Sequence, residues 1–158
     1  MKGTAFDELA FFRAIMSSGA RALLIGRRAL VVLGLPVLTA DYGFWLHLDD
    51  LETFNKAASA FDLQPSCDAG TARRRGRYVL ENDERVDVLI ARAVPTVEGQ
   101  AVTFDELWAA RELVPLTDDV SVALPSVAGL ILTKRFAARP RDVEDIRLLE
   151  VLRAERER

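Results

Sequence analysis

The sequence has one cysteine and one histidine in 158 residues, and it has no long apolar run. A single cysteine, Cys67, cannot form an internal disulfide, so a cytoplasmic location fits the chain. Apolar runs such as residues 29–33 are far shorter than the roughly 20 residues that span a bilayer, which argues against a membrane partner. No positive region followed by an apolar run stands at the N-terminus, so we expect no secretory signal.

The two scarce reactive side chains also argue against nucleophilic catalysis. Cys67 lies in a polar segment beside Pro65 and Asp68, and nothing in the sequence brings His47 to its thiol. We interpret Cys67 as an incidental thiol and His47 as a surface or strand-end residue, because a catalytic base needs a partner.

The composition is that of an ordinary globular protein. Half of the residues are apolar, 28% are charged, and the net charge of -3 says little about partners. The length fits one domain with its own core, and no shift in composition divides it. We therefore expect a single domain over residues 1–158, in which residues 139–158 form a C-terminal helix and tail.

The hydrophobic pattern predicts alternating helices and strands, which indicates an α/β (α+β) fold. Helix starts are marked by capping pairs, such as Thr4 with Asp7 and Asp49 with Glu52. Helices are predicted over residues 6–16, 28–33, 49–61, 103–111, 126–137 and 140–152. Strands are predicted over residues 22–25, 39–48, 78–80, 85–91 and 120–124, and residues 73–77 are predicted to be a basic loop.

The turn at Gly26 is the first candidate binding feature. The helix that follows would direct free backbone N–H groups and its positive dipole end beyond the turn, an arrangement that phosphate oxygens prefer. Arg27 and Arg28 would add charge-assisted donors there; alternatively, both are solvated surface residues. Arginines in the run 73–77 would steer an RNA end or a triphosphate into the site, or form a mobile solvated loop.

Two acids on predicted strands are the candidate catalytic residues. In the strand over residues 39–48, Asp41 and Gly43 share one face with Trp45, while Tyr42 and Phe44 lie on the core face. Asp87 stands between two valines, so its charge needs a metal ion, a cation or water as a partner. The alternative for Asp87 is an edge-strand acid that faces solvent.

These features resemble the nucleotidyltransferase superfamily, in its minimal bacterial branch that includes AbiEii-type toxins and the MNT proteins. Members have an apolar residue, Gly, then Gly or Ser, a spacer of about a dozen residues, and Asp-x-Asp or Asp-x-Glu. The chain supplies Ile25-Gly26-Arg27, thirteen intervening residues, and Asp41-Tyr42-Gly43. Arg27 replaces the usual small residue, and Gly43 replaces the second carboxylate.

The most specific match is the run from Leu130 to Ile146, which resembles the C-terminal AbiEii-type signature. The resemblance gives Lys134 and Asp142 roles in handling the nucleotide. Other interpretations stay open: Lys134 is a surface residue whose stem covers apolar neighbours, and Asp142 and Asp145 are acids favoured in a first helical turn.

The resemblance implies a small mixed twisted sheet flanked by helices, with further helices at the C-terminus. It also implies a nucleoside triphosphate substrate and Mg²⁺ held by carboxylates, here Asp41 and Asp87 as catalytic and metal-binding residues. The nucleotide-binding residues would be Gly26, Arg27, Arg28, Lys134 and Asp142. The acceptor would be a hydroxyl of an RNA, a protein or a small molecule.

The functional hypotheses differ in how they explain the glycine at position 43. A missing metal ligand predicts weak or absent transfer, because positioned metal charge commonly contributes several kcal/mol to transition-state stabilisation. Either the chain binds nucleotide without turnover, or a carboxylate from elsewhere substitutes, or the glycine is a deliberate inactivating change. The alternative function is a non-catalytic interaction module, such as a toxin or antitoxin partner, on the same scaffold.

Overall fold

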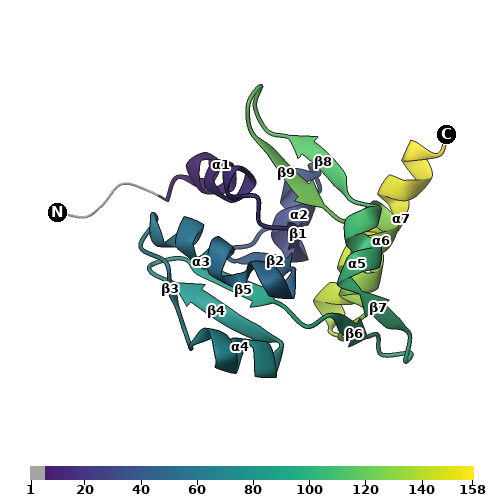
Figure 1. The fold of residues 1–158 in the computed structure, drawn as a ribbon. Helices are drawn as coiled ribbons and strands as arrows, with labels where there is room; N and C mark the ends of the chain where they lie inside the picture. The colour runs from purple at the N-terminus through teal and green to yellow at the C-terminus, as the bar shows by residue number, and fades with distance from the viewer. Residues whose placement is uncertain (1–5) are drawn as a thin grey trace.

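A five-stranded sheet forms the centre of the computed structural model, which describes residues 6–158 (Figure 1). The strand order is β1-β2-β5-β4-β3; β2 and β5 are parallel, and the other neighbours are antiparallel. The mixed sheet with flanking helices confirms the predicted fold class. The strands are β1 (Ala22–Ile25), β2 (Tyr42–Leu46), β3 (Gln64–Pro65), β4 (Arg77–Glu81) and β5 (Arg85–Leu89).

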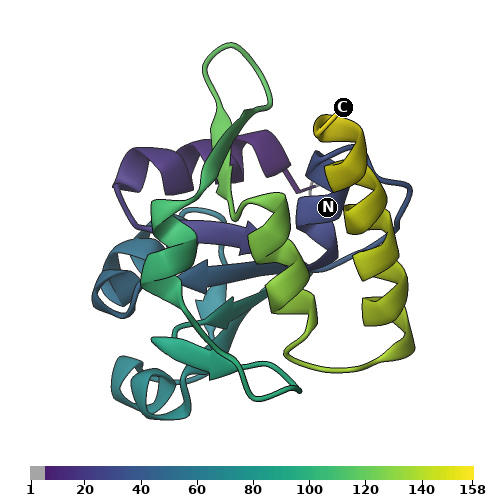
Figure 2. The same cartoon turned by 90° about the vertical axis from the view of Figure 1, so that its right-hand side faces the viewer.

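Helices surround this sheet. Helices α1 (Glu8–Ser18) and α3 (Leu51–Ser59) pack together, and the main hydrophobic core includes Phe11, Phe44 and Phe54. The C-terminal helices α6 (Val127–Lys134) and α7 (Pro140–Arg156) lie side by side (Figure 2). The remaining helices are α2 (Gly26–Val32), η1 (Leu48–Asp50), α4 (Ala69–Arg75) and α5 (Phe104–Ala109).

Two hairpins lie outside the central sheet, and the sequence pattern identified only one of their four strands. They pair β6 (Ala93–Pro95) with β7 (Ala101–Thr103), and β8 (Glu112–Pro115) with β9 (Ser121–Leu124). The loop of the β8–β9 hairpin projects from the body of the molecule (Figures 1 and 2). The three missed strands, β6, β7 and β8, have only three or four residues each, and this length gives a weak alternating pattern.

The sheet register places the candidate site on one face. Gly43 of β2 is the partner of Asp87 on β5 and of Ile25 on β1. Partners in register point to the same face, so these three positions form one row across the sheet. Asp87 is half-exposed, whereas Val86 and Val88 on either side are buried, as the alternation predicted.

The same face carries a second core. Trp45 was placed with Asp41 and Gly43 on the face away from the main core, yet it is fully buried. It packs with Leu23, Phe104 and Leu107 in a separate cluster beneath α5. Both faces of β2 are therefore covered at this end, because the segment after β5 returns over the sheet.

Several predicted boundaries differ from the structure. Thr4 lies outside the described residues; the side chain of Asp7 caps α1 by accepting from the Ala10 N–H. The predicted cap at Asp49 is wrong, because Asp50 precedes α3 without a side-chain cap bond and instead binds Arg21. The predicted loop over residues 73–77 is wrong as well: it contains the end of α4 and the start of β4.

Within residues 6–158, no helix combines the length and the apolar character needed to cross a membrane.

Candidate functional site

A cleft of about 970 Å³ collects most of the residues that the sequence singled out. One side is built by β2, β4 and β5, and the other by the end of α6, the start of α7 and the segment that joins them. Gly26, Arg27, Asp41, Asp87, Lys134 and Asp142 all line it. The volume lies in the range of roughly 300–1,000 Å³ that is usual for small-molecule sites.

Asp41 lies at the rim of this cleft, one residue before β2 begins. Its backbone is held in place, because its N–H donates to Thr39 Oγ1 at 3.2 Å and its carbonyl accepts from Arg28 Nε at 3.4 Å. The residue is exposed, and among the described residues its carboxylate has no hydrogen bond or ion pair. A carboxylate in this state is available to a ligand.

Asp87 forms an ion pair with a neighbouring arginine. Arg85 Nη2 donates to Asp87 Oδ1 at 3.0 Å, and both side chains are half-exposed. This hydrogen bond is the main cause that raises the pKa of Arg85. The cation that the valine-flanked acid was expected to need is therefore Arg85, a residue that the sequence reasoning did not select.

The donor set does not fit a carboxylate cage for divalent metal. Gly43 is half-buried beside Asp87 and contributes no ligand. In the part of the chain that the structure describes, no group of three or more His, Cys, Asp or Glu side chains is positioned to hold a metal ion. A substitute carboxylate from elsewhere in residues 6–158 is thus not in place.

Lys134 and Arg27 converge on a buried acid. Lys134 Nζ lies 2.7 Å from Asp145 Oδ2, and Arg27 Nη2 lies 3.2 Å from Asp145 Oδ1. Burial by itself would raise the pKa of Asp145, but the hydrogen bonds from Lys134 and Arg27 outweigh it and hold that pKa below its usual range. The alternative interpretation of Lys134 as a surface residue is wrong, because its side chain is only 7% exposed.

Asp142 has a structural role at the start of α7. Its Oδ2 accepts from the Arg139 N–H at 3.2 Å and from Arg139 Nε at 2.8 Å, and the residue is buried. As predicted, Asp142 lies in the first helical turn; Asp145, which was placed there too, belongs to the next turn. Spacing alone could not distinguish the acid that caps α7 from the acid that binds Lys134 and Arg27.

Arg28 is the predicted binding residue that does not line the cleft. Its guanidinium lies 4.1 Å from the centre of the Tyr42 ring, 3.5 Å from Glu8, and 3.2 Å from the carbonyl oxygen of Thr39. These contacts tie α2 to α1 and to the segment before β2. The neighbouring Arg27 points the other way, towards α7.

The cleft is strongly basic although the whole chain is acidic. Seven basic side chains line it against three carboxylates, Asp41, Asp87 and Asp142. Two of the basic residues, Arg75 and Arg77, come from the arginine run; Arg73 of that run instead binds Glu52. The seven are Arg27, Arg75, Arg77, Arg85, Lys134, Arg139 and Arg141.

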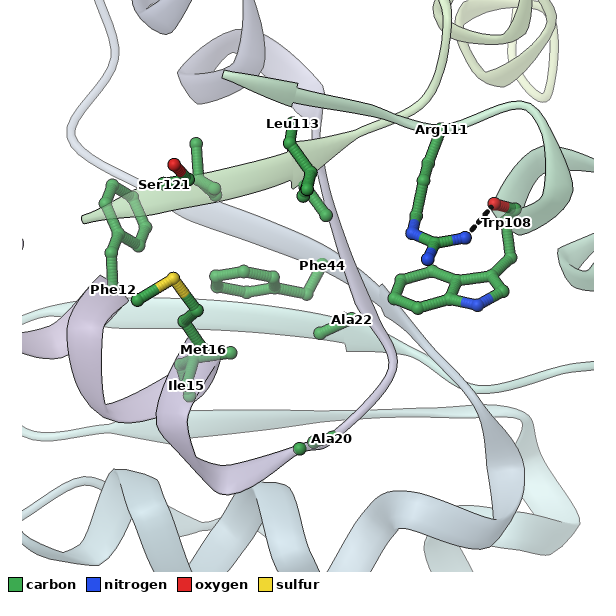
Figure 3. Close-up of a pocket in the computed structure, with 13 residues that line it drawn as sticks. Phe12, Ile15, Met16, Ala20, Ala22, Phe44, Trp108, Arg111, Leu113 and Ser121 are labelled. Atoms are coloured by element: carbon green, nitrogen blue, oxygen red, sulfur yellow. Dashed lines mark hydrogen bonds between the residues drawn. The ribbon is translucent and has the colours of Figure 1, made fainter. Parts of the chain in front are cut away.

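A second pocket is small and apolar. It encloses about 240 Å³ between α1, β2 and the β8–β9 hairpin, and Phe12, Met16, Phe44 and Leu113 line it (Figure 3). Its one charged residue, Arg111, stacks 4.0 Å from the Trp108 ring centre. None of the predicted site residues reaches this pocket.

Comparison with known proteins identifies the architecture. A crystal structure of a candidate nucleotidyltransferase from Thermotoga maritima matches with a TM-score of 0.56 at 13% identity, covering 94% of this chain and 89% of that one. The chain has the nucleotidyltransferase fold. No family model and no curated sequence matches it.

Two further solved structures match this nucleotidyltransferase fold as well. The solution structure of the antibiotic-resistance factor ANT(2'')-Ia has a TM-score of 0.61 at 14% identity, covering 94% of this chain and 88% of that one. The lincosamide antibiotic adenylyltransferase LnuA, solved with lincomycin bound, has a TM-score of 0.61 at 13% identity, covering 93% and 98%. At these identities the likeness concerns the fold.

Proposed function

We propose that this protein binds a nucleoside triphosphate in the basic cleft and transfers its nucleotidyl group weakly or not at all. The observation that carries the proposal is the cleft itself, which on a nucleotidyltransferase fold brings Gly26, Arg27, Asp41, Asp87 and Lys134 to one surface. These residues come from segments more than a hundred positions apart, so their meeting is a property of the tertiary structure.

The charges of the cleft suit the phosphate chain. Arginine presents a planar fork of donors that matches phosphate oxygens, and each such charge-assisted bond is about twice as strong as a neutral one. The exposed carboxylate of Asp41 is the group that would accept a proton from an attacking hydroxyl. In transfer, that hydroxyl oxygen would bond to the α-phosphorus, and pyrophosphate would leave.

We expect weak turnover because the set of metal-binding carboxylates is incomplete. Metal charge positioned at the reacting phosphate commonly supplies several kcal/mol, and about 1.4 kcal/mol changes a rate tenfold. Since Gly43 contributes no ligand and Asp87 is paired with Arg85, we expect transfer to be slower by orders of magnitude than with a complete acid set.

The second proposal is a non-catalytic interaction module, for example a toxin or antitoxin partner. It is supported by the pairing of Asp87 with Arg85 and of Asp142 with Arg139, which leaves two of the three cleft carboxylates satisfied within the chain. A non-catalytic interaction module needs neither a carboxylate that is free to bind a ligand nor a bound nucleotide.

Calorimetry separates the two proposals. ATP titrated into the protein in the presence of Mg²⁺ should give saturable heat, and Asp41→Ala should change the affinity because this carboxylate lies at the rim of the cleft. The absence of heat, together with no effect of Asp41→Ala, would remove the nucleotide proposal. Val151, an exposed residue of α7 that does not line the cleft, provides the control variant Val151→Ala.

A further inference from the structure

The cleft has few groups for a cation and many for an anion. Of its three carboxylates, Asp87 and Asp142 are bound by Arg85 and Arg139, so only Asp41 is free of an internal partner among the described residues. Against these stand seven basic side chains, but Arg27 and Lys134 share the buried carboxylate of Asp145, so the local excess is three positive charges in a chain whose net charge is -3. The positive charge is therefore concentrated here.

The free positive charge lies on both sides of the cleft. Arg75 and Arg77 lie at the end of α4 and the start of β4, and Arg141 lies in the first turn of α7. All three are exposed, and none has an ion-pair partner within residues 6–158. A ligand between them would be contacted from two directions.

Two positions differ in charge from what the resemblance implies. Arg27 stands where Gly or Ser was expected, and Asp145 partly offsets its charge. Gly43 stands where an acid was expected, so the cleft has one negative charge fewer there. Space does not explain the glycine. A Cβ at position 43 would meet the Ile25 carbonyl oxygen at 3.5 Å, which is ordinary contact.

We propose that the cleft binds the phosphate chain of a nucleoside triphosphate directly through its arginines, without a divalent cation. This inference rests on the proposed nucleotide-binding function and adds how the nucleotide is held. Guanidinium groups neutralise phosphate charge and bind its oxygens in pairs, which is the part that metal ions play where carboxylates are abundant.

Metal-free binding predicts the direction in which Mg²⁺ changes the affinity for ATP. Mg²⁺ bound to ATP cancels part of the phosphate charge, so it should weaken the attraction to the arginines or leave the affinity unchanged. A carboxylate cage behaves in the opposite way, because without metal its acids repel the phosphates. Likewise, Asp41→Asn should tighten ATP binding in EDTA by removing a negative charge, whereas loss of a metal ligand would weaken binding.

The experiment is calorimetric titration of the full chain with ATP, once in EDTA and once in Mg²⁺, at two salt concentrations. We expect equal or tighter binding in EDTA and weaker binding at high salt. Arg77→Gln and Arg141→Gln should each lower the affinity about tenfold, since a charge-assisted hydrogen bond contributes that much. Arg147→Gln, an equal charge change at an exposed residue of α7 outside the cleft lining, should have less than about a twofold effect.

Titrations with other ligands show which part of the nucleotide the cleft recognises. Inorganic tripolyphosphate should displace ATP, and AMP should bind at least tenfold more weakly, because the phosphate chain carries the recognition. Binding of ATP only with Mg²⁺ would overturn the metal-free inference while leaving the nucleotide proposal intact. Failure of ATP to bind under either condition would overturn the nucleotide proposal itself, as would binding of single-stranded RNA with no competition by ATP.

Discussion

Gly43 on β2 lies directly opposite Asp87 on β5, in register and on the same face of the sheet. An acid at position 43 would therefore stand next to the acid at position 87 and two residues after Asp41. The glycine has no left-handed backbone conformation that would forbid a side chain. The missing carboxylate is thus a matter of one side chain and not of backbone geometry.

We predict that Gly43→Asp folds with a free energy of unfolding within about 1 kcal/mol of the parent, because the new Cβ makes only ordinary contacts. If the glycine explains slow chemistry, label transfer from radiolabelled nucleoside triphosphates onto RNA or protein should appear in this variant alone. Gly43→Asn, which has the same size without the charge, should stay inactive. Equal transfer by both variants would contradict the explanation.

The buried acid of α7 should be essential for stability. Asp145→Ala leaves the charges of Lys134 and Arg27 without their shared partner, and breaking a buried pair in this way costs about 3–5 kcal/mol. Urea unfolding measures the loss. The matched control is Asp119→Ala, which removes the partner of Arg13 where both side chains are more than half exposed, and it should cost less than about 1 kcal/mol. Similar losses in the two variants would contradict the assignment.

Stability should fall in acid. Hydrogen bonds from Arg73 lower the pKa of Glu52 to about 2, and those from Arg21 lower the pKa of Asp50. The pKa of Asp145 is also below its usual range. Because the unfolded state binds these protons first, their stabilisation is complete above about pH 5 and is lost as the pH falls through the folded pKa values.

The measurement is the free energy of unfolding between pH 6 and pH 3. Asp50→Asn should reduce the slope in this window, because an amide does not titrate, while Asp62→Asn at an exposed residue should not. An unchanged slope in Asp50→Asn would show that its ion pair with Arg21 does not contribute.

A glycine positions the arginines of α4 and β4. Gly76 ends α4 with φ of +79°, and a Cβ there would lie 3.0 Å from the Cβ of Ala91. We predict that Gly76→Ala costs about 1–3 kcal/mol in thermal or urea unfolding. Gly99→Ala, which has positive φ but open space around it, should cost less. The reverse order would show that the contact with Ala91 is easily relieved.

Local sequence patterns were sufficient to predict the helices and strands that carry the site residues. The glycine after a short apolar strand, the valines that flank Asp87 and the Ser126 and Pro140 helix starts all act over a few residues, so they could be read directly. Patterns over longer distances were not readable. Trp45 was assigned to the open face because β7 and α5, which cover it, come about sixty residues later.

The sequence by itself determined which residues carry charge, which segments form most of the helices and central strands, and that position 43 lacks an acid. Only the tertiary structure decided which charges are available. Asp145 and Lys134 are eleven residues apart and meet Arg27 from the other end of the chain, while Arg75, Arg77 and Arg141 are left without partners in the described chain. Charge is a property of a residue, but its neutralisation depends on distances that only the folded chain sets.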